Sequence, residues 1–322
     1  MKRKDPTRPV SVWVEKERLN GEIVDCLTVI LRTKGCYWAR KNGCLMCGYI
    51  SDTDERVGLE ELRKQFDYAL KKHEKFDVIK IFTSGSFFDD GEIPEEFRKY
   101  VYDRIAERGV KKLIVESRPE FINENVAGVL SSQEFITEVG IGLETANDFV
   151  RQYCINKGFT FEQFRKAAEI LKRYGVRVKV YLLLKPPFLS EREAIEDVVE
   201  SAKAVKDYAD VISLNLTNIP SGTYIEKLWQ KGMYRSPWLW SAVETIKRIK
   251  ELGIEVISDP VAAGKQRSVH NCGKCDSVVA SAIRKFSLTQ NHEELDGLYC
   301  DCVHLWRRVV ELEDFSRIPL TY

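Results

Sequence analysis

Three cysteines lie close together near the start of the chain, Cys36, Cys44 and Cys47, with seven residues in the first gap and two in the second. Thiolates are soft ligands that suit zinc or iron–sulfur clusters. Three of them leave a four-coordinate centre one ligand short, and catalytic metals keep such a position open whereas structural zinc is closed by four protein ligands. The spacing therefore predicts an iron–sulfur cluster with one iron free for substrate or cofactor. The alternative is a structural zinc loop with a distant fourth ligand.

A second set of cysteines lies near the end of the chain, in two close pairs: Cys272 with Cys275, and Cys300 with Cys302. Four thiolates match the ligand count of a closed tetrahedral zinc site, although the gap in the second pair is tighter than usual. A second iron–sulfur cluster is the alternative, because thiolates serve both metals. His270 and His304 are alternative ligands if one of the four cysteines does not bind the metal.

Composition narrows the class of protein. The 322 residues are 44% hydrophobic and 31% charged, enough for one barrel-sized core with an appendage. The nine cysteines are an odd number in a long chain without an apolar leader or a membrane-length span, so we expect a reducing cytoplasm and metal ligation instead of disulfides. The net charge of +1 argues against a large dedicated nucleic-acid surface.

The elements that must position these cysteines alternate between strands and helices. The run Cys26–Leu31, rich in β-branched residues, predicts a buried strand directly before the first cysteines. Further strands are expected at Val78–Phe82, Leu113–Val115, Val139–Leu143, Val176–Leu184 and Val211–Leu216, with another possible at Gly253–Ile257. Helices are expected at Leu59–Leu70, from Pro94 to Arg108, and after capping boxes that begin at Thr160 and Ser190.

This alternation predicts an α/β fold with a parallel sheet, built as a complete or partial barrel. We expect an N-terminal arm over residues 1–20, the barrel over 21–258, and a cysteine-rich C-terminal region over 259–322.

Polar residues follow the predicted strands at the edge where α/β folds bind ligands. The second strand is followed by Thr83, Ser84, Gly85 and Ser86, the third by Glu116, the fourth by Glu144 and the fifth by Lys185. Glycine lets the backbone approach a ligand closely, and hydroxyl or carboxylate groups can bind an amino group or a ribose diol. These strand ends converge on the edge that holds the three-cysteine loop, which predicts a binding site for a small polar molecule.

The pattern resembles the radical S-adenosylmethionine superfamily, in which a cysteine loop follows the first strand of a partial (β/α)6 barrel. The resemblance implies that Cys36, Cys44 and Cys47 hold a [4Fe–4S] cluster whose fourth iron binds S-adenosylmethionine. It also implies cofactor contacts from Thr83, Ser84, Gly85 and Ser86, from Glu116 and Glu144, and from Lys157. The seven-residue gap, where three are usual, and Met46 at a commonly aromatic position depart from the family pattern.

Within this superfamily the chain is similar to the family of radical subunits of archaeosine synthase. The similarity lies in segments 32–36, 82–87, 115–120, 140–145 and 271–276. It implies cleavage of the lysine carbon–nitrogen bond on a lysine-bearing 7-deazaguanine in the tRNA D-loop, with a lysine-transferring subunit as partner. The alternatives are an elongator-type enzyme acting on another RNA base, and a zinc-stabilised RNA-binding protein without catalysis.

Other candidate residues receive plainer interpretations. Cys26 is expected to be a small buried side chain within its strand, and Cys154 receives no role. His73 and His292 are expected at the surface. The basic helix over Val278–Leu288 is interpreted as a solvated face in preference to an RNA contact.

Overall fold

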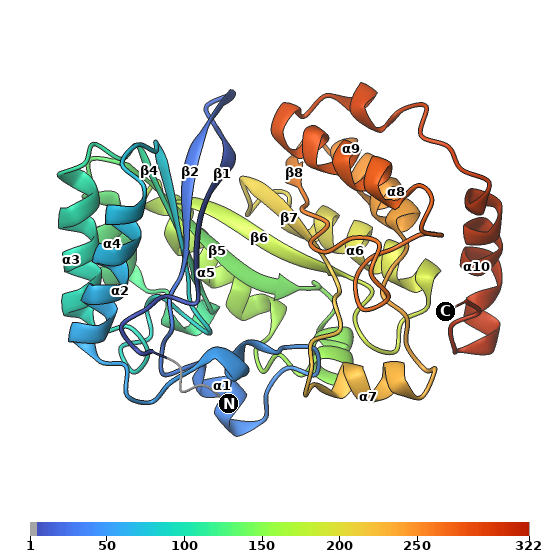
Figure 1. The fold of residues 1–322 in the computed structure, drawn as a ribbon, viewed down its shortest axis with the longest axis horizontal. Helices are drawn as coiled ribbons and strands as arrows, with labels where there is room; N and C mark the ends of the chain where they lie inside the picture. The colour runs from blue at the N-terminus through green and yellow to red at the C-terminus, as the bar shows by residue number, and fades with distance from the viewer. Residues whose placement is uncertain (1–4, 322) are drawn as a thin grey trace. The chain divides into compact units, whose positions relative to one another are not determined.

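The computed structural model describes residues 5–321. Its strands are β1 (Ser11–Leu19), β2 (Glu22–Ile30), β3 (Val78–Phe82), β4 (Lys112–Ser117), β5 (Ile136–Glu144), β6 (Arg177–Leu184), β7 (Val211–Leu216) and β8 (Glu255–Ile257). They pair in chain order in one sheet. The β1–β2 pair is antiparallel, whereas β2–β3, β3–β4, β4–β5 and β7–β8 are parallel (Figure 1).

Helices lie between the parallel strands, and two more, α9 and α10, follow the last strand. They are α1 (Tyr37–Lys41), α2 (Leu59–Lys72), α3 (Glu95–Ala106), α4 (Glu124–Ser131), α5 (Phe161–Arg173), α6 (Glu191–Val205), α7 (Tyr224–Gln230), α8 (Leu239–Lys250), α9 (Asp276–Thr289) and α10 (Cys302–Ser316). A π-helical turn covers Val150–Ile155. Strands in sequence order with helical crossovers are the arrangement of a partial (β/α) barrel, so the predicted fold class is confirmed.

The described chain forms two compact units. The first contains the residues up to Gly43 together with Tyr49–Gly142 and Glu162–Lys179. The second contains Cys44–Gly48, Leu143–Phe161 and the residues from Val180 onward.

In the first unit, α2, α3 and α4 lie together beside the early strands (Figure 1). The rings of Phe66 in α2 and Phe97 in α3 are fully buried, with their centroids 6.1 Å apart. Apolar residues spaced along one face of α2 produce this contact, and the same spacing predicts the helix.

The first unit also buries a layer of charges. Glu138 of β5 is fully buried and lies 2.8 Å from the Nζ atoms of both Lys112 and Lys179. Lys80 of β3 is similarly paired with Glu17. The neighbouring lysines outweigh the burial penalty and hold the pKa of the Glu138 carboxyl well below its usual range. These carboxylates and ammonium groups therefore remain charged inside the fold.

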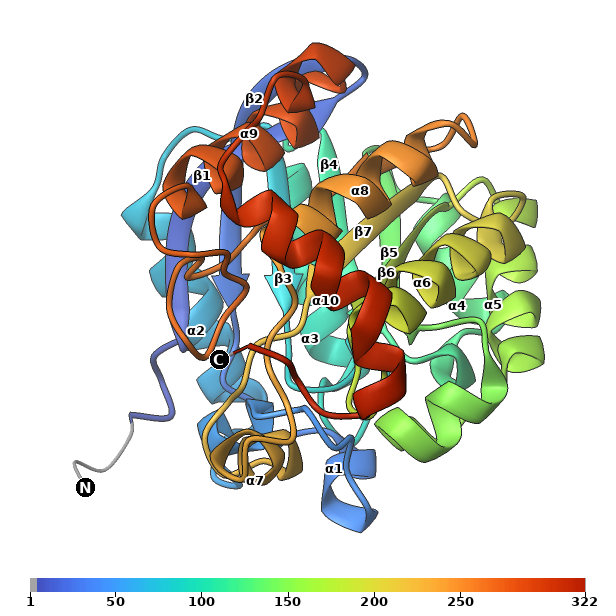
Figure 2. The same cartoon turned by 90° about the vertical axis from the view of Figure 1, so that its right-hand side faces the viewer.

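In the second unit, α10 lies alongside α6, as Figure 2 shows, and α6 in turn packs against α8. The Ser190 hydroxyl accepts a hydrogen bond from the amide of Glu193 while the Glu193 carboxylate accepts one from the amide of Ser190. This is the capping box predicted at the start of α6.

The prediction of an N-terminal arm over residues 1–20 is wrong for Ser11–Leu19, which form β1 and pair with β2 along their whole length. The connection is Asn20–Gly21, with positive φ at both residues. Asn-Gly is the preferred sequence for a tight hairpin turn, because both residues tolerate this conformation. The Asn20–Gly21 dipeptide therefore indicated a hairpin. The basic residues before it belong to a strand and do not form an arm.

Candidate active site and metal centre

Cys36 lies at the start of α1, in the loop that leaves β2. The loop is fixed by the buried carboxylate of Glu92, which accepts a 2.6 Å hydrogen bond from the hydroxyl of Thr33. Gly35 has a φ of +102°, and an added Cβ there would lie 2.6 Å from the Thr53 side chain. Because both the backbone conformation and the available space require glycine, this residue determines how the chain enters the cysteine segment.

The turn that follows β3, Thr83–Ser86, is held by the same carboxylate. Glu92 accepts hydrogen bonds from the backbone amides of Ser84, Gly85 and Ser86, at 3.0, 3.0 and 2.8 Å. Burial raises the pKa of this carboxyl above its usual value. Sequence reasoning missed Glu92, because nothing in the sequence distinguishes it from other acidic loop residues.

Gly85 brings this turn into contact with Cys36. A Cβ at Gly85 would lie 2.8 Å from the Cα of Cys36 and 2.5 Å from the Glu92 carboxylate. The Thr83 hydroxyl is buried beside this turn and has no hydrogen-bond partner among residues 5–321. The first unit thus places a half-buried thiol against a closely packed turn that retains one unsatisfied polar group.

The end of β4 adjoins the same turn. The carbonyl of Glu116 accepts a 2.8 Å hydrogen bond from the amide of Phe87, and the Ser86 hydroxyl accepts one from the amide of Arg118. The Nε atom of Arg118 donates a 2.6 Å hydrogen bond to the Glu120 carboxylate. The Cys36 segment, the Thr83–Ser86 turn and the end of β4 therefore meet within one unit.

Cys44 and Cys47 lie in the second unit. Their short segment is hydrogen-bonded on both sides, from the Leu45 amide to the carbonyl of Ile155 at 2.9 Å and from the Ile225 amide to the carbonyl of Leu45 at 3.2 Å. Cys44 packs against the buried side chains of Val150, Cys154 and Ile155. Cys154, which received no role from the sequence, thus forms part of the packing that supports a candidate ligand.

Two further candidate cofactor contacts in this unit are paired with each other. Glu144, at the end of β5, has a φ of +69° and lies 2.6 Å from the Nζ atom of Lys157. The loop between them is fixed by Arg151, which is fully buried and donates to the carbonyls of Thr145 and Phe159. Burial lowers the pKa of the Arg151 guanidinium to about 10.

Thr145 also connects this loop to α6. Its hydroxyl donates a 2.9 Å hydrogen bond to Asp197, whose second carboxylate oxygen is buried and has no partner among the described residues. Burial raises the pKa of Asp197 to about 6. The end of β5 thus rests on a carboxyl group that titrates near neutral pH.

The four C-terminal cysteines form a compact centre in the second unit. Their Sγ atoms all lie within 4.8 Å of one another, with 3.7 Å between Cys272 and Cys300 and 3.6 Å between Cys275 and Cys302. A tetrahedral ion with metal–sulfur bonds of about 2.3 Å separates its ligands by about 3.8 Å. The set therefore fits one tetrahedral metal ion.

Hydrogen bonds from neighbouring side chains reach two of these sulfur atoms. The Asn271 amide donates to the Cys275 sulfur at 3.3 Å, and the indole of Trp240 in α8 donates to the Cys302 sulfur at 3.2 Å. Such second-layer donors orient the ligands of a metal site. Because α9 and α10 begin at Asp276 and Cys302, the centre joins both helices to α8.

Several other residues singled out in the sequence lie outside the candidate sites. Cys26 is fully buried, which raises the pKa of its thiol to about 12. His270 and His304 lie outside the four-cysteine set. In α9, Arg284 pairs with Asp259 and Lys285 with Glu294, at 2.8 Å each. The basic charges of this helix are thus engaged within the chain.

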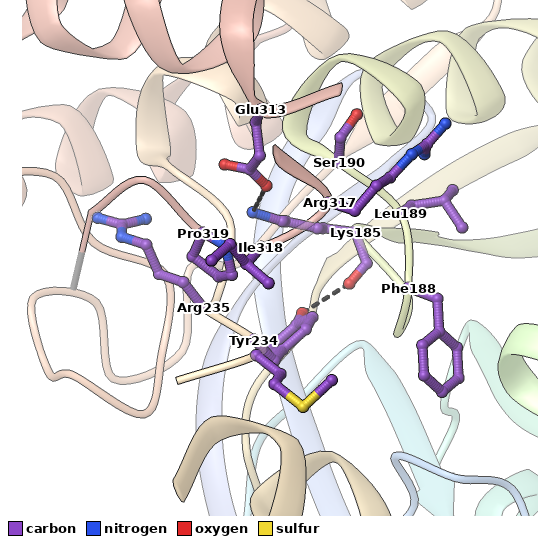
Figure 3. Close-up of a pocket in the computed structure, with 11 residues that line it drawn as sticks. Lys185, Phe188, Leu189, Ser190, Tyr234, Arg235, Glu313, Arg317, Ile318 and Pro319 are labelled. Atoms are coloured by element: carbon purple, nitrogen blue, oxygen red, sulfur yellow. Dashed lines mark hydrogen bonds and ion pairs between the residues drawn. The ribbon is translucent and has the colours of Figure 1, made fainter. Parts of the chain in front are cut away.

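A buried ion-pair cluster follows β6. The Nζ atom of Lys185 lies 2.6 Å from Glu191 and 3.0 Å from Glu313, and all three side chains are buried. Figure 3 shows Lys185 pointing toward Glu313 of α10, while the Tyr234 hydroxyl donates to the Lys185 carbonyl at 2.6 Å. The cavity beside them measures about 20 Å³, room for one water molecule. Lys185 therefore fastens α10 to the end of β6.

Comparison with known proteins places this arrangement in a family. Residues 30–200 match the model of the Radical SAM superfamily. The chain is 46% identical over 318 residues to the archaeosine synthase subunit beta of Methanosarcina acetivorans, covering 96% of this chain and 91% of the relative. It is 40% identical over 315 residues to the same subunit of Thermococcus kodakarensis, covering 94% and 97%.

A solved structure shares the fold. The queuine lyase of Clostridium spiroforme superimposes with a TM-score of 0.50 and 22% identity, covering 68% of this chain and 86% of that protein. The chain therefore belongs to the radical SAM superfamily and, within it, to the family of archaeosine synthase beta subunits. This confirms the resemblance found in the motifs. Among the described residues, no helix is long and apolar enough to cross a membrane.

Proposed function

We propose that this chain is the radical subunit of an archaeosine synthase and cleaves the lysine carbon–nitrogen bond of a lysine-bearing 7-deazaguanine in tRNA. The observation that carries the proposal is the identity of 46% along 96% of the chain to an archaeosine synthase subunit beta. Because the match covers 96% of the chain, it extends past the barrel common to the superfamily into the C-terminal region.

The cluster ligands are Cys36, Cys44 and Cys47. They stand in two short segments, each immobilised by backbone hydrogen bonds or by close packing at glycine. When bound, a [4Fe–4S] cluster and S-adenosylmethionine supply the 5′-deoxyadenosyl radical that begins the cleavage. Three thiolates leave one iron open for that cofactor.

The residues at the strand ends hold S-adenosylmethionine. Thr83 supports this role, because its buried hydroxyl lacks a partner and an amino group would satisfy it. Ser84, Gly85 and Ser86 present a backbone fixed by Glu92. Glu116, Glu144 and Lys157 supply charged groups for the amino-acid and ribose portions of the cofactor.

The four C-terminal cysteines bind zinc. The sulfur–sulfur distances of 3.6 and 3.7 Å support a single ion, because a cube that gives each thiolate its own iron spreads its ligands farther apart. The site is closed by four protein ligands and so has a structural role.

The partners are tRNA and a lysine-transferring subunit. The net charge of +1 supports a need for that second subunit, because contacts with phosphate supply most of the affinity for nucleic acid. The nine free thiols favour a reducing cytoplasm as the compartment.

An anaerobic assay tests the function. Reconstituted protein, reductant and S-adenosylmethionine are mixed with lysine-modified tRNA, and the nucleosides are analysed by mass spectrometry. We expect 5′-deoxyadenosine and archaeosine in equal amounts. Deoxyadenosine without archaeosine would leave radical chemistry intact, contradict this substrate and favour another RNA base.

A further inference from the structure

Phe188 has an energetically unfavourable conformation and environment. Its φ is +72°, a left-handed conformation that strains a residue with a bulky side chain, and 50% of its surface is exposed. Figure 3 shows its ring pointing away from the Lys185–Glu313 pair. An aromatic residue that is both strained and exposed contributes little to folding, and backbone strain of this kind clusters at ligand-binding sites.

A second exposed aromatic residue lies next to it. The ring of Tyr224 is 6.2 Å from that of Phe188, with the ring planes tilted by 50°, and Tyr224 is 45% exposed. Met233, 51% exposed, lines the same small cavity as Phe188. We call Phe188, Tyr224 and Met233 the aromatic platform. Two exposed aromatic rings beside each other offer apolar surface on which a flat ligand can stack.

The platform is attached to the segment that carries Cys44 and Cys47. Tyr224 begins α7, and the amide of the next residue, Ile225, donates to the carbonyl of Leu45. Met46 packs against the apolar side of α7. Gly48 is so close to Pro220, just before α7, that an added Cβ would lie 2.5 Å from the proline ring. The helix that carries Tyr224 is therefore joined directly to the segment that carries two of the proposed cluster ligands.

The charges around the platform are positive. Lys227 lies three residues after Tyr224 and so on the same face of α7, and Lys231 follows at the end of this helix. Over residues 5–321, neither ammonium group has a carboxylate within salt-bridge distance. The nearby Glu226 is neutralised by Arg267 at 2.6 Å. Exposed rings with unpaired cations are the combination that binds single-stranded or extruded nucleotides.

We propose that the aromatic platform stacks on a base of the RNA substrate, with Lys227 and Lys231 contacting the flanking phosphates. This deepens the proposed function and rests on it. RNA fits better than a protein partner, because lysines are depleted at protein–protein interfaces, whereas two lysines beside exposed rings match the charge of a phosphate backbone.

The test measures the affinity of anaerobic holoprotein for lysine-modified tRNA at fixed salt concentration. We expect Phe188→Ala and Tyr224→Ala to weaken binding about five- to a hundredfold, the range of one lost base–aromatic stack. Phe188→Tyr and Tyr224→Phe retain the rings and should bind like the parent. The matched control is Phe315→Ala, because Phe315 is 84% exposed but lies outside the platform. Affinity for S-adenosylmethionine should be the same in every variant.

Phe188→Gly separates binding from folding. Glycine adopts positive φ without strain, so this variant should melt at the same or a higher temperature than the parent while binding tRNA as weakly as Phe188→Ala. Lys227→Gln should lower the slope of log affinity against log salt by about one.

The outcomes separate the two proposals. A parent protein that neither binds nor converts this tRNA, even with the lysine-transferring subunit present, contradicts the proposed function, and the platform's role falls with it. If the parent converts the tRNA and both alanine variants bind it equally well, the platform alone is refuted. Loss of copurification with the lysine-transferring subunit at unchanged tRNA affinity would also overturn the proposal, because the platform would then be a protein-docking surface.

Discussion

A Cβ atom at Gly85 would lie 2.8 Å from the Cα of Cys36, closer than such atoms approach in proteins. The turn after β3 and the first cysteine are thus packed backbone to backbone. The other near neighbour of the absent side chain is the Glu92 carboxylate, at 2.5 Å, and that group is held by three amides and a threonine hydroxyl. Neither neighbour can move without disturbing the turn or the cysteine loop.

Gly85→Ala should therefore displace the cysteine loop. We expect a loss of about 1–3 kcal/mol in stability, as for other overpacked sites, and a lower iron content per folded molecule. Gly128→Ala is the matched control, because its Cβ would meet only Tyr174 at 3.7 Å and alanine favours the helix α4. Iron counting and urea denaturation test this, and equal iron in Gly85→Ala and the parent would contradict it.

The sequence predicts much of this site because its signals are local. The strand Val211–Leu216 is found at the predicted residues, and the four C-terminal cysteines converge as their count suggested. A run of β-branched residues predicts a strand, and a close pair of cysteines predicts a metal site, from only a few neighbouring positions of the chain.

The missed features depend on contacts between distant segments. Glu92 looks like any acidic loop residue until Thr33, 59 positions away, donates to it. Lys185 was noted only as a polar strand end, and its partner Glu313 lies on the last helix. The strain at Phe188 is equally invisible in the sequence, because phenylalanine, unlike glycine or asparagine, does not indicate a positive φ.

Removing one ligand of the C-terminal centre should remove its metal. Cys275→Ala leaves three thiolates, so we expect loss of about one equivalent of zinc and a lower melting temperature, because α9 and α10 begin at this centre. The iron of the other site should remain. Cys26→Ala, in the core of β2, is the control and should keep all metals. Iron lost from Cys275→Ala in place of zinc would show that the centre holds a second cluster.

Asp197 should make stability depend on pH. Its pKa is raised from 3.8 to about 6 by burial, so the folded state retains a proton that the unfolded state has already released in this interval. Stability therefore falls as pH rises from about 4 to about 6, and the cost stays constant above that window.

Asp197→Asn removes this ionisation and can still accept the hydrogen bond from Thr145. The unfolding free energy of the variant minus that of the parent should be about 1 kcal/mol larger at pH 8 than at pH 5. Urea denaturation at the two pH values measures the difference. A variant-to-parent difference that is the same at both would show that Asp197 is already ionised at pH 5.

The Lys185 cluster offers the sharpest test of how α10 is held. Lys185→Met would leave the carboxylates of Glu191 and Glu313 buried without their shared cation. Breaking a buried pair in this way typically costs about 3–5 kcal/mol, because the remaining charge stays desolvated. The control is Lys203→Met, since Lys203 pairs with Glu200 at the surface and such pairs contribute about 0–1 kcal/mol.

A double variant distinguishes lost charge balance from lost packing. Adding Glu313→Gln to Lys185→Met removes one of the two carboxylates left without a cation. The double variant should therefore lose less unfolding free energy than the sum of the losses in the two single variants. Unfolding free energies of all four proteins define this coupling, which we expect to be at least about 1 kcal/mol. Strict additivity would mean that Lys185 and Glu313 do not interact in solution, and that other contacts hold the last helix.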